Sequence, residues 1–294
     1  MQFSGRLAVL GGDERQLVML QELEKLGWQA AAWGLGKEHS ESDWKNAVEH
    51  ADAVILPLPA SADGVRIRCP LDAGASLRFS VLLERLRPGV RLLGGKLPPL
   101  WREAAEARRL VVEDYLNSET LQMRNALPTA EGAILLALQE LPVTLYGLPV
   151  AVIGYGRIGS LLAGKLNALG ASVTVCARRE RDLVHAELHG LHSMRICGEG
   201  EHSTLCGLPD GCRMVFNTVP CRILSEPVLA HLPKSCVLME LASAPGGFDP
   251  LCAERLGLRW LLASALPGRY FPESAGKILA QTLSELLRTD VQHS

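Results

Sequence analysis

The sequence predicts an α/β protein built from two doubly wound parallel-sheet domains with a cleft between them. Short apolar runs alternate with amphipathic helical stretches, which is typical of parallel strands covered by helices. The alternation starts afresh in the second half, where an apolar run leads into a glycine-rich turn and a helix. The length of 294 residues also fits two domains of about 150 residues each.

The composition is that of a globular protein with reduced cysteines. Hydrophobic residues make up 48% and the net charge is −2, which excludes disorder and gives no basic surface for nucleic acid. The longest uncharged stretch, Leu141–Gly156, contains prolines and is shorter than the ~20 residues of a membrane span. There is no leader pattern, and no two of the eight cysteines form a C-x-x-C pair. We therefore expect a cytoplasmic protein that binds neither membrane nor nucleic acid.

The first domain is expected to begin with a strand at Arg6–Leu10 that stops at Gly11-Gly12-Asp13. Leucines recur at helical spacing up to Gly27, which predicts a helix after that turn. Further helices are expected at 42–50 and 76–86. Further strands are expected at Trp28–Trp33, Ala53–Leu56, Arg91–Leu93 and Leu110–Val112.

A helix between the domains is predicted to begin at Pro128, after a polar and mixed stretch from Glu113 to Leu127, because proline is well tolerated at the first helical position. Its body, Ala133–Leu138, is almost entirely apolar, as expected for a helix buried on all sides. We assign 1–127 to the first domain, 128–147 to the helix and linker, and 148–269 to the second domain. The last helix, Pro272 to about Arg288, is expected to return to the first domain, which 270–294 completes.

The second domain opens with an apolar strand, Pro149–Ile153, and a G-x-G-x-x-G motif at Gly154, Gly156 and Gly159. A helix ending at Gly170 and a strand at Ser172–Cys176 follow, which is the context of a dinucleotide-binding, Rossmann-like domain. Later strands are expected at Met214–Phe216, Cys236–Glu240 and Leu258–Leu262.

The three glycines predict a site for a pyrophosphate. Gly154 makes the tight turn, Gly156 lets the backbone approach the phosphates, and Gly159 lets helix and strand pack closely. The intervening Tyr155, Arg157 and Ile158 lie at the helix N-terminus, where free N–H groups favour anions.

The residues after Cys176 indicate which dinucleotide is bound. An NAD site usually has Asp or Glu there for the ribose 2′-hydroxyl, whereas this chain has Arg178 and Arg179, which would pair with a 2′-phosphate. The sequence therefore favours NADP, with NAD as the alternative. The other interpretation is that the two arginines only begin the next helix.

Small residues follow two later strands of the same domain, where parallel sheets bind ligands. We assign Asn217, Thr218, Val219 and Pro220, with Ala242 and Ser243, to the cofactor, and Gly246 and Gly247 to the substrate. The alternative is that both segments are ordinary loops.

Two further segments carry candidate substrate and catalytic residues. Asp13 follows the first strand, where it would cap the next helix, and Arg15 could pair with a substrate carboxylate. Asn125, Thr129 and Glu131 surround the expected helix start at Pro128, so an anion could bind there and Glu131 could move a proton. The alternative for Glu131 is a first-turn charge that favours the helix dipole.

Neither a metal site nor a catalytic histidine is indicated. His185 and His189 lie four apart, with His192, Cys197, His202 and Cys206 nearby, but the remaining spacing fits no structural zinc pattern, so we assign no metal ligand. No histidine follows a predicted strand, which argues against a simple hydroxyacid dehydrogenase with an imidazole acid or base.

The segments quoted above resemble those of the dipicolinate synthase A-subunit family, in order and over nearly the whole chain. The likeness includes the Gly11-Gly12 turn, the Pro128–Gly132 segment, the motif ending at Gly159 and the Arg178 region. It continues in 217–220, 241–247, 266–268 and 275–277, and is weak only over 185–212.

The resemblance implies a sporulation enzyme of the bacterial mother-cell cytoplasm that works with a flavoprotein-like B-subunit. Its substrate would be the lysine-pathway intermediate formed by dihydrodipicolinate synthase, and its product pyridine-2,6-dicarboxylate. Loss of water and hydride transfer to NADP⁺ would make the ring aromatic. We assign Asn125, Thr129 and Arg15 to the two carboxylates, and Glu131 or Asp13 to the base.

Two alternatives stay open, and a homo-oligomer is expected in each case. The chain could be another two-domain NADP-dependent dehydrogenase of a small carboxylate, or a cofactor-binding regulatory protein without catalytic activity.

Overall fold

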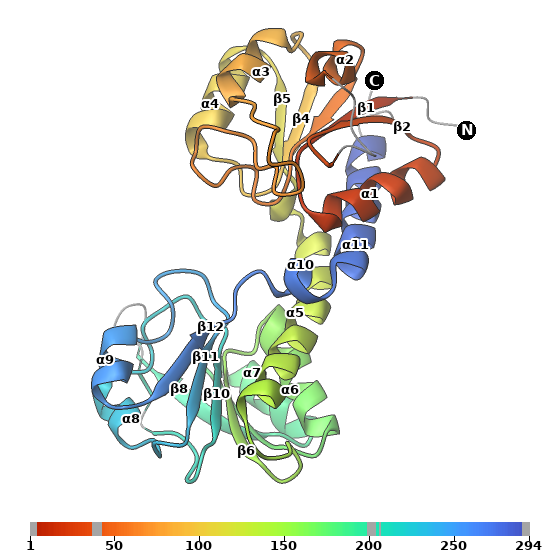
Figure 1. Cartoon of the computed structure of the whole chain (residues 1–294). Helices are drawn as coiled ribbons and strands as arrows, with labels where there is room; N and C mark the ends of the chain where they lie inside the picture. Colours follow the sequence, from red (N-terminus) through yellow and green to blue (C-terminus); the bar gives the residue numbers. More distant parts are fainter. Residues whose placement is uncertain (1–4, 37–42, 199–203, 206, 290–294) are drawn as a thin grey trace. The chain divides into compact units, whose positions relative to one another are not determined.

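The computed structural model describes residues 5–36, 43–198, 204–205 and 207–289 and contains two compact units. Unit 1 consists of the described residues up to Asn125 and from Pro267 onward, and unit 2 runs from Ala126 to Leu266. Figure 1 shows one sheet with helices on both faces in each unit. The predicted class, two α/β parallel-sheet domains, is confirmed.

The sheet of unit 1 has the strand order β2-β1-β3-β4-β5, and every described pairing between these strands is parallel. Its strands are β1 (Arg6–Leu10), β2 (Gln29–Trp33), β3 (Ala53–Ile55), β4 (Arg91–Gly94) and β5 (Val111–Asp114). The chain moves outward from β1 in one direction to β2 and in the other to β3. The point where a sheet changes direction in this way is the usual ligand position in doubly wound folds.

Two helical layers cover this sheet, because alternate strand residues point to opposite faces. Ala8 and Leu10 of β1 belong to the core under α2 (Trp44–Glu49), α3 (Phe79–Arg85) and α4 (Pro99–Ala107). Leu7 and Val9 belong to the core under α1 (Glu14–Lys25) and α11 (Pro272–Thr289). The helix α11 lies close against α1, since a Cβ on Gly276 would be 2.6 Å from Val18 Cβ. Two short helices, η1 (Tyr115–Asn117) and α10 (Leu266–Tyr270), complete the described elements around this unit.

The described residues of unit 2 form a seven-stranded sheet of order β12-β11-β10-β6-β7-β8-β9. Its strands are β6 (Pro149–Ile153), β7 (Ser172–Ala177), β8 (His192–Cys197), β9 (Thr204–Leu205), β10 (Met214–Asn217), β11 (Val237–Glu240) and β12 (Arg259–Leu262). All pairings are parallel except that of the short edge strand β9 with β8. The sheet changes direction between β6 and β10.

Helices cover both faces of the unit 2 sheet as well. The helices α6 (Arg157–Ala168) and α7 (Glu180–Leu188) lie on one side, and α8 (Glu226–Ala230) and α9 (Pro250–Arg255) on the other (Figure 1). Residues of α8 and α9 share a buried core with alternate strand residues such as Ala151 and Ile153.

The expected helix start at Pro128 is wrong. The helix α5 runs from Glu119 to Glu140, and Pro128 lies inside it. Proline removes one backbone hydrogen bond there, but Leu121 and Ala126 on the preceding turns are 99% buried. Their burial stabilises the first turns and offsets the lost bond. Asn125 and Thr129 therefore lie within a continuous helix, without the free N–H groups of a helix start.

The stretch after α7, where no strand was predicted, contains the strand β8. Residues of β8 pair with β7 in register, from Thr174 opposite His192 to Ala177 opposite Arg195, and Ile196 is buried. The polar residues His192, Ser193 and Arg195 hid this strand, because they interrupt the apolar run that marks the other strands of this sheet. His39, His202, Cys206, His293 and the expected helix residue Ser42 lie outside the described residues.

The buried cysteines Cys176, Cys212, Cys236 and Cys252 are thiols and form no disulfide. Among the described helices, none combines the length and hydropathy of a membrane span.

Candidate functional sites

The glycine-rich turn of unit 2 is tight at its ends and open in the middle. Gly154 has a φ of +94°, and a Cβ there would lie 2.6 Å from Thr218 Oγ1. A Cβ on Gly159 would lie 2.2 Å from the Gly154 carbonyl oxygen. A Cβ on Gly156 would meet nothing within 4 Å, although this residue caps α6. The turn therefore has room beside bare backbone at the helix N-terminus, which fits a diphosphate group.

A cavity of 670 Å³ adjoins this turn, a volume typical of small-molecule sites. It lies where the unit 2 sheet changes direction, because its walls include residues that follow β6 and β10. Ten of the predicted cofactor residues line it: Gly154, Tyr155, Gly156, Arg157, Ile158, Arg178, Arg179, Thr218, Val219 and Pro220.

Arg178 and Arg179 differ from the arginines around them. Arg181 contacts the Asp182 carboxylate at 3.3 Å, and Arg195 pairs with Glu180. In the described parts of the chain, no carboxylate pairs with Arg178 or Arg179, and both are exposed at the cavity. Two guanidinium groups are thus available to an anion at the end of β7.

Tyr155 also lines the cavity, and its hydroxyl lies 3.3 Å from His185 Nδ1. Burial, together with the charge of Asp182, raises the pKa of this hydroxyl above its usual value. Tyr155 is therefore neutral at physiological pH and acts as a ring surface or hydrogen-bond donor rather than as a base.

Asn217, Ala242, Ser243, Gly246 and Gly247 do not line the cavity. Three of them, Asn217, Ala242 and Gly247, form a structural network around a residue that sequence reasoning missed. The carboxylate of Glu240, at the end of β11, accepts hydrogen bonds from Asn217 Nδ2 at 2.6 Å, Ala242 N at 2.9 Å and Gly247 N at 2.8 Å. The only sequence signal was an acidic residue ending an apolar strand. These hydrogen bonds fix the loops that follow β10 and β11.

Glu131 of α5 contacts Lys165 of α6, with 2.9 Å between Oε1 and Nζ. Around this ion pair, apolar residues of the two helices, including Ile134, Leu138 and Leu169, line a separate hollow of 420 Å³. Glu131 does not line the glycine-turn cavity of its own unit.

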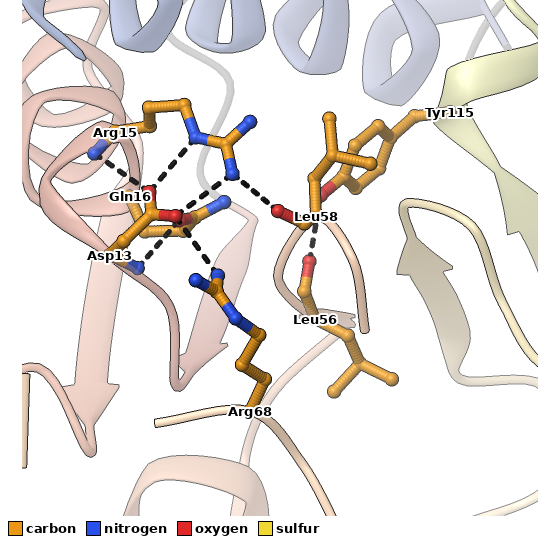
Figure 2. A network of polar contacts seen from close by, with 7 residues as sticks. All are labelled: Asp13, Arg15, Gln16, Leu56, Leu58, Arg68 and Tyr115. Atoms are coloured by element: carbon orange, nitrogen blue, oxygen red, sulfur yellow. Dashed lines mark hydrogen bonds and ion pairs between the residues drawn. The ribbon is translucent and has the colours of Figure 1, made fainter. Parts of the chain in front are cut away.

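In unit 1, the carboxylate of Asp13 holds two guanidinium groups where β1 ends (Figure 2). Its Oδ1 accepts from Arg15 Nε at 2.9 Å, and its Oδ2 accepts from Arg15 Nη2 at 2.8 Å and Arg68 Nη1 at 2.9 Å. Asp13 also caps α1, since Oδ1 accepts from Arg15 N, while Gln16 Oε1 accepts from Asp13 N. The predicted cap is thus present, together with an ion-pair network.

The position of Arg15 is fixed by its neighbours. Arg15 is 93% buried, and its Nη2 also donates to the carbonyl of Leu58 in the loop after β3. A Cβ on Gly268 would lie 2.7 Å from Arg15 Nε, so only glycine leaves room for this guanidinium. Burial alone would raise the pKa of Asp13, but the hydrogen bonds and charges of Arg15 and Arg68 outweigh it and lower the pKa below its usual value.

Arg68 is the second site residue that sequence reasoning missed. It lies in the loop between β3 and α3, 55 residues from Asp13. The backbone N–H of Arg68 donates to the Ala60 carbonyl at 3.1 Å, and the backbone carbonyl of Arg68 accepts from Gly12 N at 2.9 Å. Gly11 has a φ of +70°, and a Cβ there would lie 2.6 Å from the Arg68 oxygen. The Gly11-Gly12 pair was visible in the sequence, but its contact with the loop that contains Arg68 was not.

Tyr115 lies beside this network, next to Leu58, and is fully buried (Figure 2). Its hydroxyl donates to the Leu56 carbonyl at 3.0 Å, and burial strongly raises its pKa. It supports the loop after β3 and takes no part in proton transfer. Over the residues that the structure describes, no three His, Cys, Asp or Glu side chains form a group that could hold a metal ion.

Comparisons with known proteins identify related sequences and structures. A sequence model described as the N-terminal domain of the dipicolinate synthase A-subunit matches residues 6–116. The dipicolinate synthase A-subunit of Bacillus subtilis (strain 168) is 32% identical over 295 residues, covering 96% of this chain and 95% of that protein. The crystal structure of the dipicolinate synthase A-subunit from Bacillus halodurans has 26% identity and a TM-score of 0.86, covering 98% of this chain and 99% of that chain.

A D-lactate dehydrogenase from Sporolactobacillus sp shares the fold at 16% identity, with a TM-score of 0.58 over 97% of both chains. The chain therefore has the fold of Rossmann-type dehydrogenases.

Proposed function

The chain belongs to the dipicolinate synthase A-subunit family, and we propose that it is an NADP-dependent oxidoreductase that forms pyridine-2,6-dicarboxylate during sporulation. Its substrate would be the dihydrodipicolinate-type intermediate of the lysine pathway. The observation that carries this proposal is the open glycine turn beside a 670 Å³ cavity, in a chain related to the family over 96% of its length.

The cofactor would bind to unit 2, at the end of β6. The backbone from Gly154 to Gly159 would hold its diphosphate, because the space beside Gly156 is open and the N–H groups of α6 face it. Arg178 and Arg179 would pair with the 2′-phosphate, since each lacks a carboxylate partner in the described residues and no acidic residue ends β7. When bound, the cofactor supplies a hydride acceptor.

The dicarboxylate substrate would bind to unit 1 through Arg15. Its guanidinium is oriented by Asp13 and Leu58, which leaves Nη1 for a substrate carboxylate. Asn125 and Thr129, four residues apart on one face of α5, are further candidate contacts. Gly246 and Gly247, after β11, are candidates through their backbone only, because a Cβ on either would lie within 2.8 Å of Glu240 or Asn217.

Two carboxylates are candidates for the base that removes a proton from the substrate ring. Asp13 is ionised at neutral pH, but both of its oxygens are engaged by arginines, which makes it a better positioning group than base. Among the residues that the structure describes, Glu131 pairs with Lys165 alone. Unchanged turnover of Glu131→Gln or of Asp13→Asn, with full NADP⁺ binding, would remove that residue from the role.

The proposed partner is the B-subunit of dipicolinate synthase, since the family name describes one of the subunits of a synthase. We further propose that the chain acts in the mother-cell cytoplasm and forms a homo-oligomer.

The direct test is to incubate the purified chain with the lysine-pathway intermediate and NADP⁺, with and without the B-subunit, and to measure pyridine-2,6-dicarboxylate. Product from this chain alone supports the proposal. Product only with the B-subunit present would require site variants of this chain to separate a catalytic role from a regulatory one. Reduction of NADP⁺ by other small carboxylates, without dipicolinate, would contradict the proposed substrate.

A further inference from the structure

We propose that Arg68 is a second substrate-binding arginine, and that Arg15 and Arg68 together form a site for a small dicarboxylate at the carboxyl edge of the unit 1 sheet. This inference rests on the proposed function, because it names the residues that select its substrate class.

The position of the two arginines in the fold is the first argument. The sheet order β2-β1-β3-β4-β5 changes direction between β1 and β3. Arg15 follows β1, and Arg68 belongs to the loop that follows β3. Loops beyond the carboxyl ends of strands on either side of such a point form the ligand site of doubly wound folds. Unit 2 has its glycine turn and cavity at the same topological position.

The charge balance of the network is the second argument. Two guanidinium groups share the single carboxylate of Asp13, so the cluster carries one positive charge in excess. A few residues away, Arg66 pairs with Asp63 one to one on the exposed surface. A purely structural ion pair needs only one arginine for each carboxylate. The second arginine at Asp13 therefore leaves charge for an anionic ligand.

The unused hydrogen-bond donors are the third argument. Arg15 uses Nε and Nη2, and Arg68 uses one N–H of Nη1. In the described part of the protein, neither Arg15 Nη1 nor the Nε and Nη2 of Arg68 has an acceptor. Guanidinium groups bind carboxylates most strongly through two parallel N–H donors, and Arg68 retains Nε and Nη2 for such a contact, while Arg15 retains Nη1 for a single one. Because both contact Asp13 Oδ2, they are close enough to hold two carboxylates of one small ring (Figure 2).

Both arginines are held in place before any ligand binds. Asp13 orients the two guanidinium groups, Gly268 leaves room for that of Arg15, and backbone bonds to Ala60 and Gly12 fix Arg68. Such support lowers the entropic cost of binding a rigid anion.

The test is calorimetric binding of two probes, pyridine-2,6-dicarboxylate and pyridine-2-carboxylate, to the full chain. The variants are Arg68→Gln, Arg68→Lys and the control Arg66→Gln, which removes the same charge from the same loop. We expect wild type and Arg66→Gln to bind the dicarboxylate about 10- to 100-fold more tightly than the monocarboxylate. Arg68→Gln should bind both probes within about threefold of each other, and Arg68→Lys should be intermediate.

The preference between probes is the decisive readout, because a purely structural role of Arg68 would weaken both alike. Circular dichroism checks the fold, and Arg68→Lys decides the question if Arg68→Gln does not fold. An unchanged preference in the folded variant, or no dicarboxylate binding by wild type, would overturn the inference. If wild type forms dipicolinate and Arg68→Gln keeps the preference, only this inference fails. If the preference depends on Arg68 but no turnover occurs, only the proposed reaction fails.

Discussion

The two units use the same topological position in different ways. In unit 2, bare backbone surrounds the end of β6, with open space at Gly156 and exposed arginines at the rim. In unit 1, charged side chains occupy the end of β1, where Asp13 binds Arg15 and Arg68. The first arrangement suits a large ligand with a diphosphate, and the second suits a small anion with carboxylates.

The sequence encodes the two kinds of site in different ways. A backbone site is built by a few glycines that lie close together in the sequence, and it depends on the absence of their side chains. A side-chain site is built by residues from separate loops, and it depends on charge and on the neighbours that hold each guanidinium. The four predictions that follow test this contrast, from the largest expected effect to the smallest.

The strongest prediction concerns the empty space at Gly156. In Gly156→Ala, the new Cβ meets no protein atom within 4 Å, so the fold should be retained, but the methyl group would occupy the diphosphate position. We expect NADP⁺ affinity to fall about 100-fold, as for overpacking of 2–3 kcal/mol. Gly164→Ala is the matched control, since it lies on the same helix with equally open space. Equal NADP⁺ affinities of the two variants in a fluorescence titration would contradict a backbone site.

The second prediction separates the arginines of unit 2 from those of unit 1. The double variant Arg178→Gln/Arg179→Gln should bind NADP⁺ about 10- to 100-fold more weakly, because two charge-assisted contacts are lost. Its NAD⁺ affinity should change less than about threefold, which makes NAD⁺ the internal control. Arg255→Gln, an exposed arginine paired with Glu226, should alter neither. A parallel loss of NADP⁺ and NAD⁺ binding would show that these arginines do not recognise the 2′-phosphate.

The third prediction concerns the support of Arg15. In Gly268→Ala, the new Cβ would lie 2.7 Å from Arg15 Nε, and the flexible end of that side chain must move. We expect the KM for the dicarboxylate to rise about tenfold, close to 1.4 kcal/mol, with the KM for NADP⁺ unchanged. Steady-state kinetics with each substrate varied in turn measure this. A rise in the KM for NADP⁺ alone would contradict the assignment of Arg15 to the substrate.

The smallest effect is on stability. The pKa of Asp13 is lowered in the folded protein, so its ionised form stabilises the fold above the unfolded-state pKa of about 3.9. This contribution is lost as the pH falls through the lower, folded-state pKa. Asp13→Asn should therefore be less stable than wild type by about 1 kcal/mol at pH 7, the typical value of a helix cap with its ion pairs.

Urea denaturation at a series of acidic pH values measures this difference, which should shrink as the pH falls below the unfolded-state pKa of about 3.9. A constant difference across that range would mean that the charge of Asp13 does not contribute to the stability of the fold.

The predictability of each feature follows from how local its cause is. The strands at 6–10 and 149–153 and the glycine turn were predictable because apolar runs and G-x-G-x-x-G are contiguous patterns. The start of α5 was not, because burial of Leu121 and Ala126 in the folded protein outweighs the proline signal at Pro128. Arg68 and Glu240 could not be assigned either, since Arg68 contacts Asp13, 55 residues away, and Glu240 contacts Asn217, 23 residues away. Asp13 and Arg15 could be proposed from the sequence because they lie in and just after the glycine turn that ends β1.

The central claim is that the end of β6 in unit 2 binds a nicotinamide dinucleotide phosphate. Isothermal titration of the purified chain with NADP⁺ and, separately, NAD⁺ tests it most directly. The account predicts saturable binding at a single site per chain, tighter for NADP⁺ than for NAD⁺. Absence of heat from both nucleotides up to millimolar concentration, with the chain folded, would contradict it.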